Sequence, residues 1–216
     1  MPICLALEIG RNRGVVVLTV MRQKLLMSDH EERTLHADKW SGRPPGRTTS
    51  GLSIEAHESF ADARVDDRPI DTLIVAGGHG TLGAMEDREL LDFVEFAASK
   101  ADRVVSICTG AMILAEIGIL DGKRATTHWW WCPILEKKYP KVQVEPDAIY
   151  VRDGNIWTSA GVTTGMDLAL SLVELDWGHD VALQVARYNV MYMMRPGGQT
   201  QFSAHLIAQR AEDPVI

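Results

Sequence analysis

A run of six residues, Ser-Ile-Cys-Thr-Gly-Ala at 106–111, constrains the fold more than any other stretch. Residues 103–107 have the pattern of a short buried strand, and residues 111–117 are rich in good helix formers. Cys108 is therefore predicted to lie on a strand-to-helix turn, where Gly110 lets the helix begin close to the strand. This geometry is typical of a nucleophile elbow at the carboxyl end of a parallel strand. The alternative is a buried cysteine that packs as a small hydrophobe.

The predicted position of Cys108 also predicts its reactivity. A helix N-terminus offers unpaired N–H groups and the positive end of the helix dipole, and both favour a thiolate. We therefore expect the pKa of the Cys108 thiol to lie below the value of about 8.5 for a free thiol. Cys108 is then expected to react with alkylating agents before Cys4 or Cys132.

A second glycine-containing turn follows another predicted strand. Residues 72–76 read as a buried strand, and Gly77, Gly78 and His79 come directly after it. The carboxyl ends of neighbouring parallel strands meet at one edge of a sheet. The backbone N–H groups of Gly78 and Thr109 are therefore candidate donors to one developing oxyanion. A Gly-Gly pair after a strand is also compatible with an ordinary turn.

Two histidines are candidate bases for the Cys108 thiol. His128 lies where a predicted extended segment meets a predicted helix, and His79 lies beside the candidate oxyanion donors. The alternative for His128 is a partly buried residue at the start of the helix. His128 and Cys132 are spaced to share a helix face. No fourth ligand has the spacing of a metal site, so we predict no metal. We also predict no cofactor.

Half of the six tryptophans lie in the run 129–131. One interpretation makes Trp129 part of an apolar wall over a pocket at Cys108. The other makes the run core packing together with a dimer contact. The two interpretations are compatible. Because the run and a methionine-rich late helix offer more apolar surface than a monomer usually exposes, we expect a two-fold homodimer.

Strands and helices alternate along the chain. Helices are predicted over 86–100, 129–139, 164–175 and 180–193, and Asp153-Gly154 is a hairpin-turn signal. Further strands are predicted at 4–9, 15–20, 52–56, 142–144 and 149–151, with 123–127 extended. This alternation predicts an α/β protein with a mostly parallel sheet.

Composition restricts the partners and the compartment. The net charge of −7 and the lack of a long basic run argue against this chain alone binding nucleic acid. The three cysteines form no disulfide pattern, which indicates a reducing compartment. We find neither a signal peptide nor an apolar stretch of membrane-spanning length. A cytoplasmic location without a membrane partner is therefore expected.

Several motifs together carry a resemblance to a known superfamily. Residues 71–78, DTLIVAGG, and residues 106–111 resemble the PfpI branch of the class I glutamine-amidotransferase-like superfamily. The motifs at 120–129, 158–167 and 195–202 narrow the resemblance to the sensor half of AraC-type transcriptional regulators that carry a PfpI-like domain. The resemblance covers residues 48–202.

The resemblance implies a flavodoxin-like sandwich, with a mostly parallel sheet and helices on both faces. It implies a PfpI-like domain over 1–198, and a tail at 199–216 leading to a DNA-binding domain that this chain lacks. DNA would then be contacted only through that missing domain. An unknown small molecule would bind near the turn. The expected site residues are Cys108 and His128 as catalytic candidates, with Gly77, Gly78, His79, Thr109, Gly110 and Trp129 around them.

Two departures from the superfamily pattern bear on the alternative function, a cysteine-dependent enzyme such as an isocyanide hydratase-like lyase. Protease-like members place a histidine directly after the cysteine, where this chain has Thr109. Members usually carry an acidic residue after the first strand, and Glu8 is the one candidate here. Without a carboxyl group at Cys108, hydratase chemistry lacks its proton donor. The leading hypothesis is therefore a sensing domain rather than an enzyme.

Overall fold

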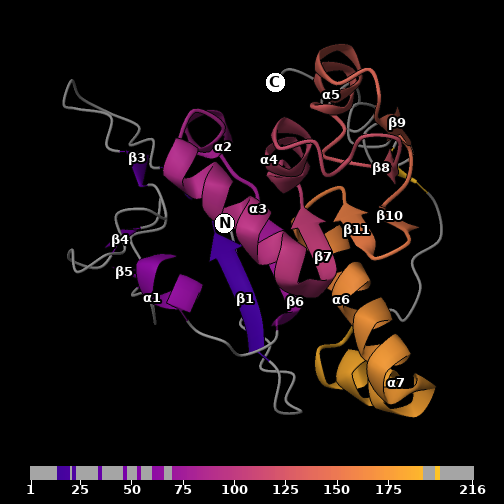
Figure 1. Cartoon of the computed structure of the whole chain (residues 1–216). Coiled ribbons are helices and arrows are strands. Elements are labelled where there is room, and N and C mark those ends of the chain that lie inside the picture. The colour runs from indigo at the N-terminus through magenta and orange to yellow at the C-terminus, as the bar shows by residue number, and fades with distance from the viewer. Residues whose placement is uncertain are drawn as a thin grey trace, which may run out of the picture.

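A five-stranded sheet in the order β1-β6-β7-β11-β10 lies at the centre of the molecule (Figure 1). The computed structural model describes residues 14–19, 21–22, 34–35, 46–47, 53–54, 60–65, 70–191 and 198–199. The first four strands in this order are parallel and β10 runs antiparallel to β11. The strands of this sheet are β1 (Gly14–Thr19), β6 (Ile70–Ala76), β7 (Ala101–Ile107), β10 (Tyr150–Asp153) and β11 (Ile156–Ser159).

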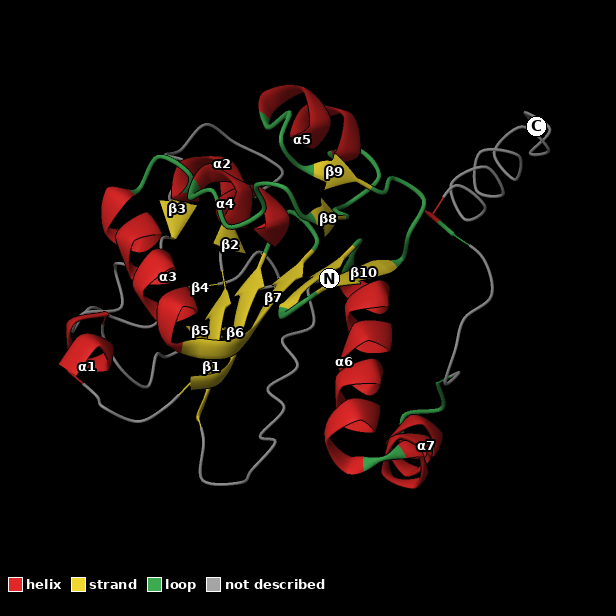
Figure 2. Cartoon of the chain, turned by 45° about the vertical axis from the view of Figure 1, so that its right-hand side comes forward, coloured by secondary structure: helices red, strands yellow, loops and turns green. Residues whose placement is uncertain are grey.

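Helices cover both faces of the sheet (Figure 2). Helices α3 (Arg88–Lys100) and α4 (Gly110–Glu116) pack on one face, and α6 (Val162–Trp177) packs on the other. This arrangement confirms the predicted flavodoxin-like α/β sandwich. The shorter helices are α1 (Phe60–Val65), α2 (Thr81–Ala84), α5 (Cys132–Lys138) and α7 (His179–Tyr188). Three small pairings join β2 (Met21–Arg22) to β3 (Thr34–Leu35), β4 (Gly46–Arg47) to β5 (Ser53–Ile54), and β8 (Arg124–Ala125) to β9 (Gln143–Val144).

The central strands carry apolar side chains on both faces of the sheet, because helices bury both faces. Leu73, Val75 and Val104 belong to the core cluster under α3 and α4. The alternate residues Ile74 and Val105 pack in the second cluster, with side chains of α6. Continuous apolar runs are what parallel strands covered on both faces require. The predicted strands 72–76 and 103–107 are confirmed as parts of β6 and β7.

Several predicted elements differ in their bounds, and three of the differences have a local cause. Helix α5 begins at Cys132 rather than at residue 129, because Pro133 is suited to a first helical turn. Helix α7 ends at Tyr188 rather than at residue 193, because Val190 adopts a left-handed φ of 53° and Met191 N–H closes back onto Ala186. The hairpin between β10 and β11 turns at residues 154–155, one residue later than predicted. The strand predicted at 4–9 lies outside the described residues.

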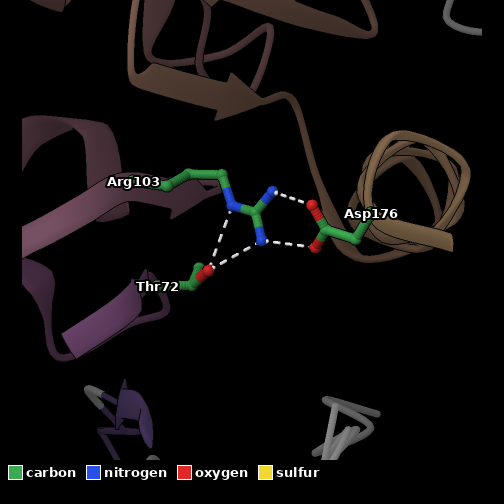
Figure 3. A network of polar contacts seen from close by, with 3 residues as sticks. All are labelled: Thr72, Arg103 and Asp176. Carbon is green, nitrogen blue, oxygen red and sulfur yellow. Dashed lines mark hydrogen bonds and ion pairs between the residues drawn. The ribbon is translucent and has the colours of Figure 1, made fainter. Parts of the chain in front are cut away.

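A partly buried arginine, Arg103, ties α6 to the sheet (Figure 3). Arg103 of β7 forms a two-pronged pair with Asp176 of α6, with N···O distances of 3.0 and 2.8 Å. The same guanidinium donates to the Thr72 hydroxyl on β6 at 3.0 and 2.9 Å. This geometry uses the planar fork of arginine, which lysine cannot reproduce.

We expect Arg103→Met to lower the free energy of unfolding by about 1–2 kcal/mol, because it removes charge-assisted hydrogen bonds to two elements. Urea denaturation of the whole chain measures the loss. The matched control is Lys141→Met, which breaks the exposed pair between Lys141 and Asp121 and should leave the urea midpoint unchanged. Equal losses of stability in the two variants would show that the Arg103 contacts stabilise the fold no more than an exposed ion pair does.

In the part of the chain that the structure describes, no helix is long and apolar enough to cross a membrane.

Candidate functional site

Cys108 lies between β7, which ends at Ile107, and α4, which begins at Gly110. Its φ is 57°, a left-handed conformation that costs an L-residue about 1–2 kcal/mol. Two hydrogen bonds hold it there. The Cys108 N–H donates to the Ser159 carbonyl at 2.9 Å, and the Thr127 hydroxyl donates to the Cys108 carbonyl at 2.8 Å. The predicted position on a strand-to-helix turn is confirmed, and strained backbone of this kind is frequent at functional sites.

Two glycines allow the turns after β6 and β7 to touch. A Cβ atom at Gly110 would overlap the Val75 carbonyl oxygen, and one at Gly77 would overlap both Gly110 N and Thr109 Oγ1. The Gly77 N–H also donates to the Ile107 carbonyl at 2.8 Å. The expected meeting of the two turns at one sheet edge is therefore confirmed, and glycine is required at both points of contact.

A cluster of hydroxyl groups fills the space between the two turns. The Gly78 N–H donates to Thr109 Oγ1 at 2.8 Å, and Thr109 Oγ1 lies 2.7 Å from Thr81 Oγ1. The Thr81 hydroxyl also lies 2.8 Å from the Gly78 carbonyl, to which it can donate. A ligand oxygen would have to replace the Thr109 hydroxyl to reach the Gly78 N–H, so the oxyanion role of Gly78 stays a prediction. Thr81 was missed from the sequence, although a hydroxyl three residues after a glycine turn is a known local cap.

Burial controls the direction in which the pKa of the Cys108 thiol is shifted. Burial raises the pKa of this thiol above its ordinary value, and the opposing effects of the Thr109 N–H and hydroxyl are smaller. The sequence-based expectation of a lowered pKa is therefore wrong in direction, because desolvation of the sulfur outweighs the helix terminus. Cys108 is half-buried and Cys132 is buried, so exposure still favours reaction at Cys108 over Cys132. Cys4 lies outside the described residues.

The His128 imidazole lies at the carboxyl end of β11. Its Cδ2 atom is 3.9 Å from where a Cβ atom of Gly161 would stand. The Trp130 N–H donates to Nδ1 at 3.3 Å, which places the proton of the neutral ring on Nε2. Burial lowers the pKa of His128 below its ordinary value. No hydrogen bond within residues 70–191 joins the Cys108 sulfur to His128, so a base role for His128 stays a prediction. The competing base, His79, is exposed.

We expect the stability of the chain to fall as the pH drops below about 6.5 because of His128. The pKa of His128 is lower in the folded state than in the unfolded state, so the stabilisation is complete above about pH 6.5 and is lost as pH falls through the folded pKa. His128→Asn keeps an acceptor for the Trp130 N–H and removes the titration. Urea denaturation at a series of pH values should show a shallower acid slope for this variant. The exposed-site control, His79→Asn, should keep the wild-type slope, and an unchanged slope in His128→Asn would contradict the assignment.

Cys132 and His128 do not share a helix face as expected, because α5 begins only at Cys132. The Cys132 thiol is positioned to donate to the backbone carbonyls of Thr127 at 3.5 Å and His128 at 3.7 Å. Burial raises the pKa of this thiol as well. Among the described residues, no group of three histidine, cysteine or acidic side chains is arranged to hold a metal.

The tryptophan run forms a turn before α5 rather than the first part of a helix. Trp129 and Trp130 are 47% and 65% exposed, and Trp131 packs against the main core. The Trp129 ring lies 5.5 Å from the His128 ring and 5.4 Å from the Trp130 ring, measured between centroids. Trp129 therefore adds an exposed apolar surface beside His128. Its contact with a ligand and the dimer contact both stay predictions.

Comparison with protein families gives one match, the DJ-1/PfpI family, over residues 15–175. The chain belongs to the DJ-1/PfpI family. The matched region contains the two glycine turns, Cys108 and His128. The family assignment agrees with the resemblance carried by residues 71–78 and 106–111.

The relatives of this DJ-1/PfpI chain include an enzyme and transcriptional regulators. It is 37% identical to an isonitrile hydratase of Pseudomonas putida, over 73% of this chain and 65% of that protein. It is 30% identical to the HTH-type transcriptional regulator GbdR of Pseudomonas aeruginosa, over 74% of this chain and 45% of the regulator. A solved THiJ/PfpI family protein from Pseudomonas syringae is 29% identical with a TM-score of 0.61, covering 78% of this chain and 70% of that one. The chain thus spans less than two thirds of the length of these first two relatives.

Proposed function

We propose that this chain is the small-molecule-sensing domain of an AraC-type transcriptional regulator. The observation that carries the proposal is the match to GbdR, which covers most of this chain and less than half of the regulator. A domain of this kind needs a pocket and a means of reporting its occupancy, and it does not need turnover. DNA would be bound by a separate domain, and the domain is proposed to act as a homodimer in the cytoplasm.

The pKa shifts of Cys108 and His128 support a binding role and indicate which class of ligand the site favours. Burial raises the pKa of the Cys108 thiol and lowers that of the His128 imidazole, so it disfavours the charged form of each. The hydroxyls of Thr109 and Thr81 are neutral donors and acceptors, and Trp129 adds an apolar face. These described side chains favour a small uncharged ligand over an anion. The proposed ligand residues are Gly77, Gly78, His79, Thr109, Gly110 and Trp129, with Cys108 and His128.

The proposal is tested by thermal unfolding of the whole chain against a library of uncharged metabolites. A ligand that binds the native state raises the melting temperature by linkage, by an amount that grows with its concentration. The rise should be lost in Thr109→Val, which keeps the side-chain shape and removes the hydroxyl. Val181→Thr, the reverse exchange at an exposed position of α7, serves as the control and should keep the response. A library-wide absence of such a response would argue against sensing of uncharged metabolites.

A second function, hydration of an isonitrile, is favoured by the 37% identity to the isonitrile hydratase. The reaction adds water to the terminal carbon of R–N≡C and gives the formamide R–NH–CHO, so a nucleophile and a proton donor must act together. The groups that favour the Cys108 thiolate are the N–H and hydroxyl of Thr109, and no described carboxylate is among them. Glu8, the acidic residue expected from the sequence, lies outside the described residues. The raised pKa of the Cys108 thiol supports the sensing role over this alternative.

A further inference from the structure

Two residues far along the chain dock against the segment that holds the site. Gln199 is 7% exposed, and its backbone N–H donates to the Asp147 carbonyl at 2.9 Å. Gly198 lies so close to the Asp147 carboxylate that a Cβ atom at this position would overlap it. We call these two residues the 198–199 dipeptide. Its contacts place it beside the turn that leads into β10.

The side chain of Gln199 donates into this segment from its single amide nitrogen. Nε2 lies 2.8 Å from the Ala148 carbonyl, 3.0 Å from Thr126 Oγ1 and 3.2 Å from the Thr127 carbonyl. Thr126 and Thr127 are fully buried, so water does not replace these bonds while the fold is closed. All three neighbouring oxygens can accept a hydrogen bond, so this position favours a donor. The amide nitrogen of Gln199 supplies two hydrogens to them.

One residue joins the 198–199 dipeptide to the candidate site. The Thr127 carbonyl faces Gln199 Nε2, and the Thr127 hydroxyl donates to the Cys108 carbonyl at 2.8 Å. His128 is the next residue in the chain. A movement of Gln199 away from Thr127 therefore releases the same residue that holds the strained Cys108 turn.

We propose that the 198–199 dipeptide is a latch that couples occupancy of the Cys108 site to the chain beyond the domain. This proposal rests on the proposed function, in which the dipeptide lies at the junction with the DNA-binding half. The docked dipeptide bonds to Thr126 and Thr127, and the Thr127 hydroxyl in turn bonds to the backbone carbonyl of Cys108. A group added at Cys108 needs space, and that space opens when Gln199 undocks. Occupancy and undocking then favour each other, because coupling between two sites is reciprocal.

The first test measures the reaction of Cys108 with iodoacetamide in the whole chain. The sulfur–carbon bond forms as iodide leaves, and the thiol proton passes to solvent. Gln199→Glu keeps the side-chain shape and removes the donors, so we expect alkylation of Cys108 to be on the order of fivefold faster or more. Gln184→Glu makes the same change at an exposed position of α7 and should keep the wild-type rate.

A second variant disturbs the latch through a different atom. Gly198→Ala places a Cβ atom against the Asp147 carboxylate, so it should accelerate the same reaction without changing Gln199. Circular dichroism and a cooperative thermal transition show that each variant is folded. A folded Gln199→Glu and a folded Gly198→Ala that both react at the wild-type rate would overturn the proposal.

The reciprocal test labels Cys108 first and then follows hydrogen exchange. Carbamidomethylation of Cys108 should speed exchange at the Gln199 N–H, which is bonded to Asp147 in the docked state. Unchanged exchange in the labelled chain would also overturn the latch. Both tests use iodoacetamide rather than a natural ligand. The latch can therefore fail while sensing holds, and it can hold in a chain that proves to be an enzyme.

Discussion

Gly110→Ala is expected to lower the free energy of unfolding by about 4 kcal/mol or more, in the range that marks severe core disruption. The added methyl group would overlap the backbone carbonyl of Val75, and backbone atoms of a central strand cannot move aside as a flexible side chain does. The turns after β6 and β7 must then separate. Urea denaturation and circular dichroism of the whole chain measure the effect.

The control for this variant is Gly118→Ala. Gly118 has a left-handed φ of 76° and no atom lies within 4 Å of its added Cβ. The control therefore carries only the conformational strain of an L-residue, about 1–2 kcal/mol. Equal losses in the two variants would mean that the contact between the two turns is not as close as described.

Thr127→Val is expected to destabilise the chain by about 1–2 kcal/mol, because it removes the 2.8 Å hydrogen bond to the Cys108 carbonyl and leaves the longer bond from the Ala111 N–H, at 3.5 Å. Valine keeps the shape of threonine, so packing changes little. The loss should be accompanied by faster alkylation of Cys108, since its left-handed turn is held by fewer bonds. The comparison variant is Val181→Thr, the reverse exchange at an exposed position of α7, and it should change neither quantity. A stable Thr127→Val with unaltered Cys108 reactivity would contradict the assigned role of Thr127.

The sequence predicts the strands, turns and helix that hold the site, because these elements depend on local patterns. Strands β6 and β7 carry unbroken apolar runs, and a Gly-bearing turn follows each run directly. Those two facts suffice to bring Gly77 and Cys108 to one edge of a parallel sheet. Helix α3 is equally local, with an amphipathic stripe and Asp87 as a cap that accepts the Leu90 N–H at 3.1 Å.

The parts that the sequence does not predict depend on contacts between distant residues. The pKa of Cys108 is set by how much surrounding chain buries the sulfur, and a helix N-terminus alone predicts the opposite direction. The Gly78 N–H is taken by the hydroxyl of Thr109, 31 residues later. Gln199 reaches Thr126 across 73 residues. No periodicity or turn signal encodes such pairs, so they follow only from the folded arrangement.

The central claim is that this DJ-1/PfpI domain binds a small molecule without turning it over. The most direct measurement compares the whole chain with Cys108→Ala for the conversion of benzyl isonitrile to N-benzylformamide, with the product measured by liquid chromatography and mass spectrometry. The account predicts that the wild type forms product no faster than Cys108→Ala. Formamide production by the wild type that is lost in Cys108→Ala would contradict the sensing role and establish the hydratase.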